Sequence, residues 1–125
     1  MNLSRYVAVR AIAANWACQD IPLYPLRTEG LRQLQAGVGI YIACRSDMQV
    51  RYVGSAVRPG RSTGIAERIC AHPAERRGQW WWFWILPLLD TTPVTIVRGI
   101  EGQVIDLLHP IENARRHRLI LIPSR

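Results

Sequence analysis

Residues Gly37–Ser55 read G-V-G-I-Y-I-A-C-R-S-D-M-Q-V-R-Y-V-G-S, and the rest of the predicted fold is arranged around this stretch. Two short runs rich in Val, Ile and Tyr flank a polar break at Arg45-Ser46-Asp47. Apolar runs of this kind on either side of a short polar break are typical of a β-hairpin. The sequence therefore predicts two antiparallel strands joined by a tight turn.

The register of this hairpin determines which side chains share a face. If the chain folds about Ser46-Asp47, Tyr41 lies opposite Tyr52 and Gly39 lies opposite Gly54. Directly opposed residues share a face, so the Cβ atoms of the two tyrosines would be about 5 Å apart. The glycines beside them would leave the backbone open to close approach of a ligand. A slip of one residue would place the tyrosines on opposite faces.

The chain is strongly basic. It has 125 residues, enough for one modest core, and its 16 basic residues, all arginines, outnumber nine acidic residues to give a formal net charge of +7. A preference for arginine codons would explain the missing lysines but not the excess over acids. The excess favours a polyanionic partner such as nucleic acid.

Cysteine content and hydropathy indicate the compartment. Cys18, Cys44 and Cys70 are widely spaced and form no disulfide framework, which predicts a reducing cytoplasm. The longest apolar run, Trp80–Leu89, has about half the length that a membrane span requires, so no membrane segment is predicted.

A helix is predicted after the hairpin and the basic loop Arg58–Ser62. Thr63 is its candidate N-cap and Pro73 ends it after His72. One stripe, at helical spacing, consists of Ile65, Arg68, Ile69 and His72. A lone arginine there could snorkel and a lone histidine could be a satisfied core residue. Arg68 and His72 together at one helix edge favour a functional site.

Trp80–Leu86, W-W-W-F-W-I-L, is a predicted third strand that Pro87 ends. It is aromatic on both faces, and one face can cover the core. The other face would pack on a helix, form a homodimer interface, or stack nucleobases beside Arg76 and Arg77. Packing or dimerisation is favoured over stacking, because an exposed row of indoles promotes aggregation.

A last helix is predicted from Thr92-Pro93 to about Leu108, before Pro110. Its apolar stripe consists of Val97, Ile100, Val104 and Leu108. Glu101 falls inside this stripe, where a carboxylate is unfavourable unless it is paired or holds a metal. An ion pair with one of the many arginines is the simpler alternative.

The two ends of the chain carry less information. Within residues 1–36, predicted to be an N-terminal extension that packs on the core, Tyr6–Ala14 fits a strand or a helix poorly, and Thr28 could cap a short helix over Glu29–Ala36. Residues 116–125 are predicted to be a basic tail or an edge strand, with Leu119–Ile122 as the strand.

The inward polar residues suit phosphodiester hydrolysis. One carboxylate can anchor a hydrated Mg²⁺, which prefers oxygen ligands and keeps several waters. A metal ion and a guanidinium can stabilise the negative charge that develops on the phosphate. A phenol and an imidazole within reach of a water can remove its proton.

Gly39-Ile40-Tyr41 and Tyr52-Val53-Gly54 resemble the two signature tripeptides of the GIY-YIG nuclease superfamily, with Val for Ile in the second. In that superfamily an arginine follows on a helix, a glutamate lies on a later helix, and an asparagine follows a proline beyond it. Residues 37–115 match this pattern in order and approximate spacing, through Arg68, Glu101 and Asn113. His72, four residues after the arginine, is most similar to the restriction-endonuclease branch.

The resemblance implies a role for each matching residue. Tyr41 would help to deprotonate the attacking water with His72 as proton acceptor, Tyr52 would orient the phosphate or water, and Arg68 would stabilise the transition state. Glu101 would bind Mg²⁺ or Mn²⁺, and Asn113 would steady the site. Which tyrosine acts as the base stays open.

The sequence thus predicts an α/β domain of the α+β type, with a small, mainly antiparallel three-stranded sheet flanked by helices. The predicted function is a Mg²⁺-dependent endonuclease acting on DNA, although the sequence does not distinguish DNA from RNA. The alternative is a catalytically silent nucleic-acid-binding module with the same fold. Six arginines are predicted to contact nucleic acid: Arg58, Arg61, Arg76, Arg77, Arg115 and Arg116.

Overall fold

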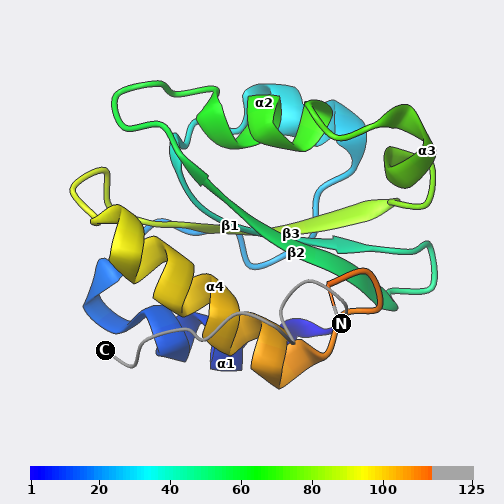
Figure 1. The fold of residues 1–125 in the computed structure, drawn as a ribbon, viewed down its shortest axis with the longest axis horizontal. Helices are drawn as coiled ribbons and strands as arrows, with labels where there is room; N and C mark the ends of the chain where they lie inside the picture. The colour runs from blue at the N-terminus through cyan, green and yellow to red at the C-terminus, as the bar shows by residue number, and fades with distance from the viewer. Residues whose placement is uncertain (114–125) are drawn as a thin grey trace.

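The computed structural model describes residues 1–113. Its centre is a three-stranded antiparallel sheet with the strand order β2-β1-β3 (Figure 1). The strands are β1 (Val38–Cys44), β2 (Val50–Val57) and β3 (Trp82–Pro87). The predicted α+β class, with a small antiparallel sheet flanked by helices, is confirmed. The predicted contacts of Arg115 and Arg116 and the predicted strand at Leu119–Ile122 lie outside the described residues.

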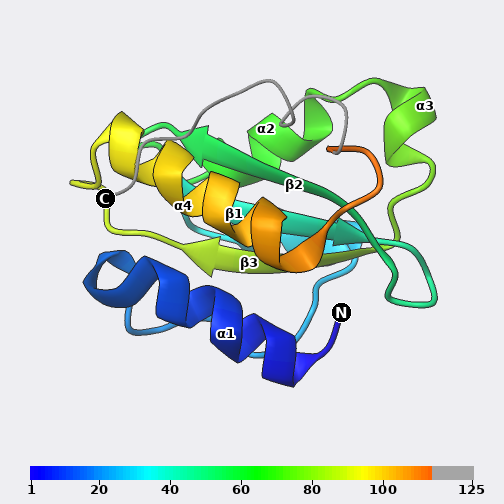
Figure 2. The same ribbon diagram turned by 60° about the horizontal axis from the view of Figure 1, so that its bottom comes forward.

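Helices cover both faces of the sheet, as Figures 1 and 2 show. α1 (Leu3–Ala13) and α4 (Val94–Leu108) lie on one face, which we call the α1/α4 face. α2 (Gly64–Cys70) lies on the other, the α2 face, and is followed by the short α3 (Ala74–Arg77). Among residues 1–113, no helix is both long and apolar enough to span a membrane.

The hairpin register differs from the predicted one by two residues. Tyr41 pairs with Gly54, and Tyr52 pairs with Ala43. One residue of the difference comes from the turn, where Met48 adopts φ 70° and the Arg45 N–H donates to Gln49 O, so that the loop has three residues. The other comes from Arg51, an extra residue opposite the Ala43/Cys44 step that forms a β-bulge.

These two shifts restore the predicted faces. Each alone would turn one tyrosine to the opposite face, because side chains alternate along a strand. Together they leave both tyrosines on the α2 face, with ring centroids 6.1 Å apart. The predicted direct pairing of Tyr41 with Tyr52 is wrong, but the shared face is confirmed.

Gly54 makes room for a side chain of the protein rather than for a ligand. A Cβ atom at this position would lie well inside van der Waals contact of the Tyr41 ring. At Gly39, a Cβ atom would lie against Leu86 O and the Ile65 side chain. The predicted open backbone beside the tyrosines is therefore filled from within the molecule.

The last helix and the third strand follow the predicted pattern. α4 begins after Pro93 and ends at His109, whose left-handed φ of 50° stops it before Pro110. Its whole predicted apolar stripe is buried. In β3, Trp84 packs on the α1/α4 face and Phe83 on the α2 face, so both faces of this strand are covered within the chain.

The N-terminal residues form helices. α1 is capped by Asn2, whose side chain accepts a hydrogen bond from Arg5 N (2.9 Å). Tyr6 on its buried side donates to the carbonyl of Ile85 in β3. The short helix predicted over residues 29–36 is instead a 3₁₀ helix, η2 (Thr28–Gln33), because the chain becomes extended at Leu34. A second 3₁₀ turn, η1 (Ala14–Trp16), follows α1.

Candidate active site

Three predicted site residues meet on the α2 face. Tyr41 of β1 and Tyr52 of β2 project from this face, and His72 lies in the turn after α2. Tyr41 Oη lies 2.7 Å from His72 Nε2, within hydrogen-bond distance. The Tyr52 and His72 rings meet edge to face, with centroids 5.0 Å apart. The helix ends at Cys70 rather than at His72 as predicted, but the two tripeptides and His72 still produce a direct phenol–imidazole contact.

The position of His72 is held from its backbone as well as its ring. Its N–H donates to Ile69 O (3.2 Å), and its carbonyl accepts from Arg77 Nε (2.9 Å). The tautomer of His72 decides the direction of the contact with Tyr41: with Nε2 unprotonated, the phenol donates to it. Tyr41 is fully buried, while Tyr52 and His72 are 4% and 6% exposed.

Trp80 completes this cluster, although it was not predicted from the sequence as a site residue. Its ring stacks on Tyr52 with centroids 5.3 Å apart and meets His72 at 4.9 Å. It lies just before β3, which begins at Trp82 rather than at residue 80 as predicted. Its place at the start of the aromatic run, three residues after Arg77 of α3, was the available signal. We call Tyr41, Tyr52, His72 and Trp80 the aromatic cluster.

Glu101 lies on the other face of β2. It is half-buried on α4 and accepts a hydrogen bond from Ser55 Oγ. Ser55 pairs with Ile40, which belongs to the α1/α4 face, whereas its neighbour Gly54 pairs with Tyr41 on the α2 face. The structure therefore places Glu101 and the aromatic cluster on either side of one strand rather than in one pocket.

Asn113 binds the free edge of that strand. Its side chain is fully buried, accepts from Val53 N (2.7 Å) through Oδ1 and donates to Val53 O (2.8 Å) through Nδ2. The preceding residue, Glu112, donates its N–H to Arg51 O (2.8 Å). Asn113 thus fixes the backbone directly after Tyr52, as a neighbouring strand would.

Arg68, the predicted transition-state arginine, is half-buried on α2. Ile65 and Ile69 of the same stripe are fully buried, which confirms the helix orientation. Within residues 1–113, the Arg68 side chain has no hydrogen bond or ion pair. Its guanidinium can therefore accept an anionic ligand without giving up another partner.

The predicted nucleic-acid arginines that the structure describes are held by other groups. Arg58 and Arg61 both pair with Glu67, at 3.0 and 2.6 Å. Hydrogen bonds from Arg61, then from Thr63, lower the pKa of the Glu67 carboxyl to about 2. Arg76 pairs with Glu112 at 3.4 Å. These internal pairs reduce the charge available to a polyanion.

The donor set at Glu101 fits Mg²⁺ better than zinc. Among the described residues, no group of three or more His, Cys, Asp and Glu side chains could hold a metal ion. Mg²⁺ binds through one or two carboxylates and keeps several waters, so a single half-buried carboxylate suits it. Structural zinc sites use four nitrogen or sulfur ligands.

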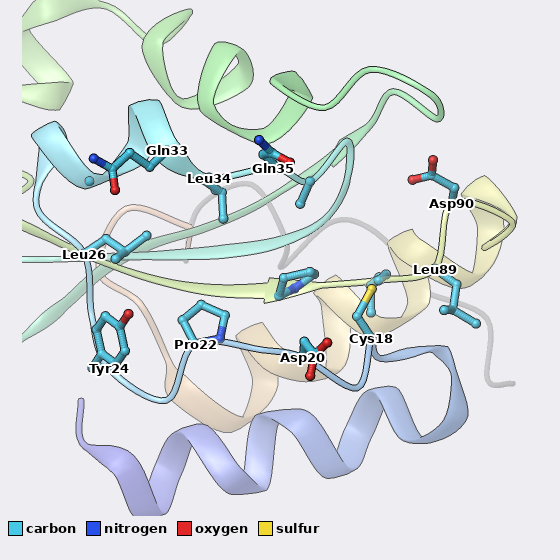
Figure 3. Close-up of a pocket in the computed structure, with 14 residues that line it drawn as sticks. Cys18, Asp20, Pro22, Tyr24, Leu26, Gln33, Leu34, Gln35, Leu89 and Asp90 are labelled. Carbon is cyan, nitrogen blue, oxygen red and sulfur yellow. The ribbon is translucent and has the colours of Figure 1, made fainter.

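A hollow of about 530 Å³ lies beside the end of β3, at the edge of the sheet opposite β2 (Figure 3). Its lining includes Asp20, Asp90 and the Cys18 thiol, and no basic residue. Burial, together with these two carboxylates, raises the pKa of Cys18. A hollow with this charge does not suit nucleic acid, and it shares no residue with the aromatic cluster.

Comparison with models of known protein families, with curated proteins and with solved structures gave no match.

Proposed function

We propose that this chain is a Mg²⁺-dependent endonuclease of the GIY-YIG type that hydrolyses DNA phosphodiester bonds in the cytoplasm. The observation that supports the proposal most is the contact between Tyr41 Oη and His72 Nε2 at 2.7 Å, with the Tyr52 ring against His72. Both tyrosines come from the two signature-like tripeptides, and the histidine comes from the predicted helix edge. A phenol hydrogen-bonded to an imidazole is a proton relay suited to activating a water.

Each residue has one role in the proposed reaction. The phenol of Tyr41 takes the proton of the attacking water as it passes its own proton to His72 Nε2. Tyr52 orients the phosphate, and Arg68 stabilises the charge that develops on it. Glu101 would hold Mg²⁺, which when bound neutralises negative charge on the same phosphate.

The geometry adds a requirement to this mechanism. Because Tyr41 is fully buried, water reaches its phenol only after side chains that pack against it on the α2 face move away. Because Glu101 lies on the other side of β2, the scissile phosphate must sit across the outer edge of this β-strand, part of which Glu112 and Asn113 already bind. One such site cuts one of the two DNA strands, so the expected product from a plasmid is a nick.

The second candidate is the silent nucleic-acid-binding module. The same two observations favour it: a fully buried Tyr41 and a carboxylate separated from the aromatic cluster by β2. The basic composition suits both candidates, so salt-sensitive binding does not separate them.

Incubation of purified protein with supercoiled plasmid, in Mg²⁺ or in EDTA, tests the proposal. We expect nicking that requires Mg²⁺ and that falls at least about 100-fold in Glu101→Ala. Glu75→Ala, which removes an exposed carboxylate from α3, is the matched control and should nick at the wild-type rate. Binding to plasmid, duplex, branched DNA and RNA without cleavage of any of them would support the silent module instead.

A further inference from the structure

The carboxylate of Glu112 is held by donors from three parts of the chain. Arg51 Nε of β2 and Trp80 Nε1 both lie 3.1 Å from Glu112 Oε2. Arg76 Nε of α3 lies 3.4 Å from Oε1. We call Arg51, Arg76 and Trp80 the Glu112 cradle.

The cradle adjoins the candidate active site. Trp80 is itself a member of the aromatic cluster and stacks on Tyr52. The guanidinium carbon of Arg76 lies 5.4 Å from the Tyr52 ring centroid. An anion in the cradle would therefore lie beside Tyr52, on the α2 face.

The cradle has more positive charge and more donors than one carboxylate uses. Two guanidiniums face one carboxylate, and each contacts it through Nε. Within residues 1–113, the terminal nitrogens of Arg51 and Arg76 have no hydrogen-bond partner. The three side chains are partly open to solvent, with exposed fractions of 21% for Arg51, 35% for Arg76 and 15% for Glu112. A guanidinium fork binds a phosphate as readily as it binds a carboxylate.

The Glu112 side chain can leave the cradle without unfolding its segment. The backbone N–H of Glu112 donates to Arg51 O (2.8 Å), and the Asn113 side chain binds Val53 through both its amide oxygen and its amide nitrogen. These contacts hold the segment on the edge of β2 independently of the carboxylate. Rotation of the Glu112 side chain alone, which is 15% exposed, would open the cradle.

We propose that the Glu112 cradle is a binding site for a backbone phosphate of nucleic acid, and that the Glu112 carboxylate occupies it until nucleic acid binds. The inference rests on the proposed function in one respect only, that nucleic acid is the partner. It does not require that the protein cleaves nucleic acid. The carboxylate then acts as an internal competitor that lowers affinity and is displaced by the phosphate.

The affinity for a fluorescent DNA duplex of about 20 base pairs, measured by fluorescence anisotropy, tests this competition. EDTA in the buffer prevents Mg²⁺-dependent cleavage. We expect Glu112→Gln to tighten binding about fivefold, because it removes the competing charge. Glu75→Gln, the same change on an exposed residue next to Arg76, should tighten binding less than about twofold. Glu112→Gln that binds no more tightly than Glu75→Gln would overturn the proposal.

A measurement on the wild-type protein needs a variant only to assign one resonance. Titration with inorganic phosphate should shift the Trp80 indole N–H resonance, which Trp80→Phe identifies, because the indole exchanges a carboxylate for a phosphate. An unmoved resonance at phosphate saturation would overturn the proposal. Because both experiments omit Mg²⁺, their outcomes are independent of the outcome of the plasmid-nicking assay.

Discussion

The α1/α4 face of the sheet is covered mainly by aliphatic side chains, together with Tyr6 and Trp84, whereas the α2 face near the turn gathers four hydrogen-bonding rings. Ile40, Val53 and Ile100 are among the fully buried residues of the first. The second brings together Tyr41, Tyr52, His72 and Trp80. The same strands supply both faces, because alternate residues of β1 and β2 point to opposite sides.

Under the proposed function, this difference divides the residues that stabilise the fold from those that carry the chemistry. Aliphatic side chains stabilise the fold by burial alone and offer no group for proton transfer or recognition. The rings of the aromatic cluster bury area as well, but each of the four also carries a polar atom. Adjacent residues such as Tyr52 and Val53 project to the two faces from one strand.

The strongest test of this comparison is Ile100→Ala, on the α1/α4 face. Ile100 is fully buried, so we expect a loss of about 3 kcal/mol in the free energy of unfolding, from lost transfer free energy and a residual cavity. Urea denaturation measures it. Well below the unfolding midpoint, the aromatic cluster should stay intact and plasmid nicking should continue.

Leu107→Ala is the matched control on the same helix. Leu107 is 40% exposed, and its removal should change the free energy of unfolding by less than about 0.5 kcal/mol. Equal losses from the two variants would show that burial on this face does not set stability.

The second test separates the two tyrosines of the α2 face. Tyr41→Phe removes the hydroxyl that contacts His72, and we expect nicking to fall about 100-fold, against about 10-fold for Tyr52→Phe. Single-turnover nicking rates with saturating protein measure the difference. Equal or reversed losses would contradict the assignment of Tyr41 as the base.

A stability measurement keeps this result interpretable. Loss of one buried hydrogen bond lowers the free energy of unfolding by about 1 kcal/mol, so both variants should remain folded at the assay temperature. A Tyr41→Phe protein that is unfolded there would show a structural role for the hydroxyl and not a catalytic one.

The faces of the hairpin could be predicted from the sequence, but its register could not. Alternation of apolar residues gives the face of each side chain. The three-residue loop depends on a left-handed Met48. The bulge depends on Arg51, which has no partner in the β1–β2 register, and neither residue type signals such a conformation. The two unpredicted shifts compensate, so the tyrosines share a face although they are not paired.

The candidate site was predicted in part for similar reasons. Helical spacing brought His72 to the sheet, and the structure places it against Tyr41. The same spacing put Glu101 in the apolar stripe of α4 but could not show which strand edge it meets. Glu112 lies in a turn without periodicity, and its partners come from residues up to 61 positions away, so no local pattern marks it.

The smallest expected effect lies on the outer side of α2, where Glu67 binds two exposed arginines. Hydrogen bonds from Arg61 and Thr63 hold the pKa of Glu67 at about 2, below the ordinary value of about 4.3. A folded-state pKa below the unfolded one stabilises the fold above the unfolded value, and this contribution is lost as pH falls from about 4.3 towards 2. Because the Arg61 and Glu67 side chains are open to solvent, with exposed fractions of 64% and 33%, the contribution is screened by salt and should be far smaller than that of Ile100.

Carboxyl ¹³C NMR against pH measures the Glu67 titration directly, and we expect a midpoint near 2 in low salt. Arg61→Gln removes the largest cause and should raise the midpoint towards its ordinary value, while Thr63→Ala should raise it less. A midpoint that stays near 2 in Arg61→Gln would assign the shift to Thr63 and Arg58 instead. That result would leave Arg61 free for a polyanion. The outer side of α2 would then be part of the nucleic-acid surface, in contrast to the ion pairs with Glu67 described above.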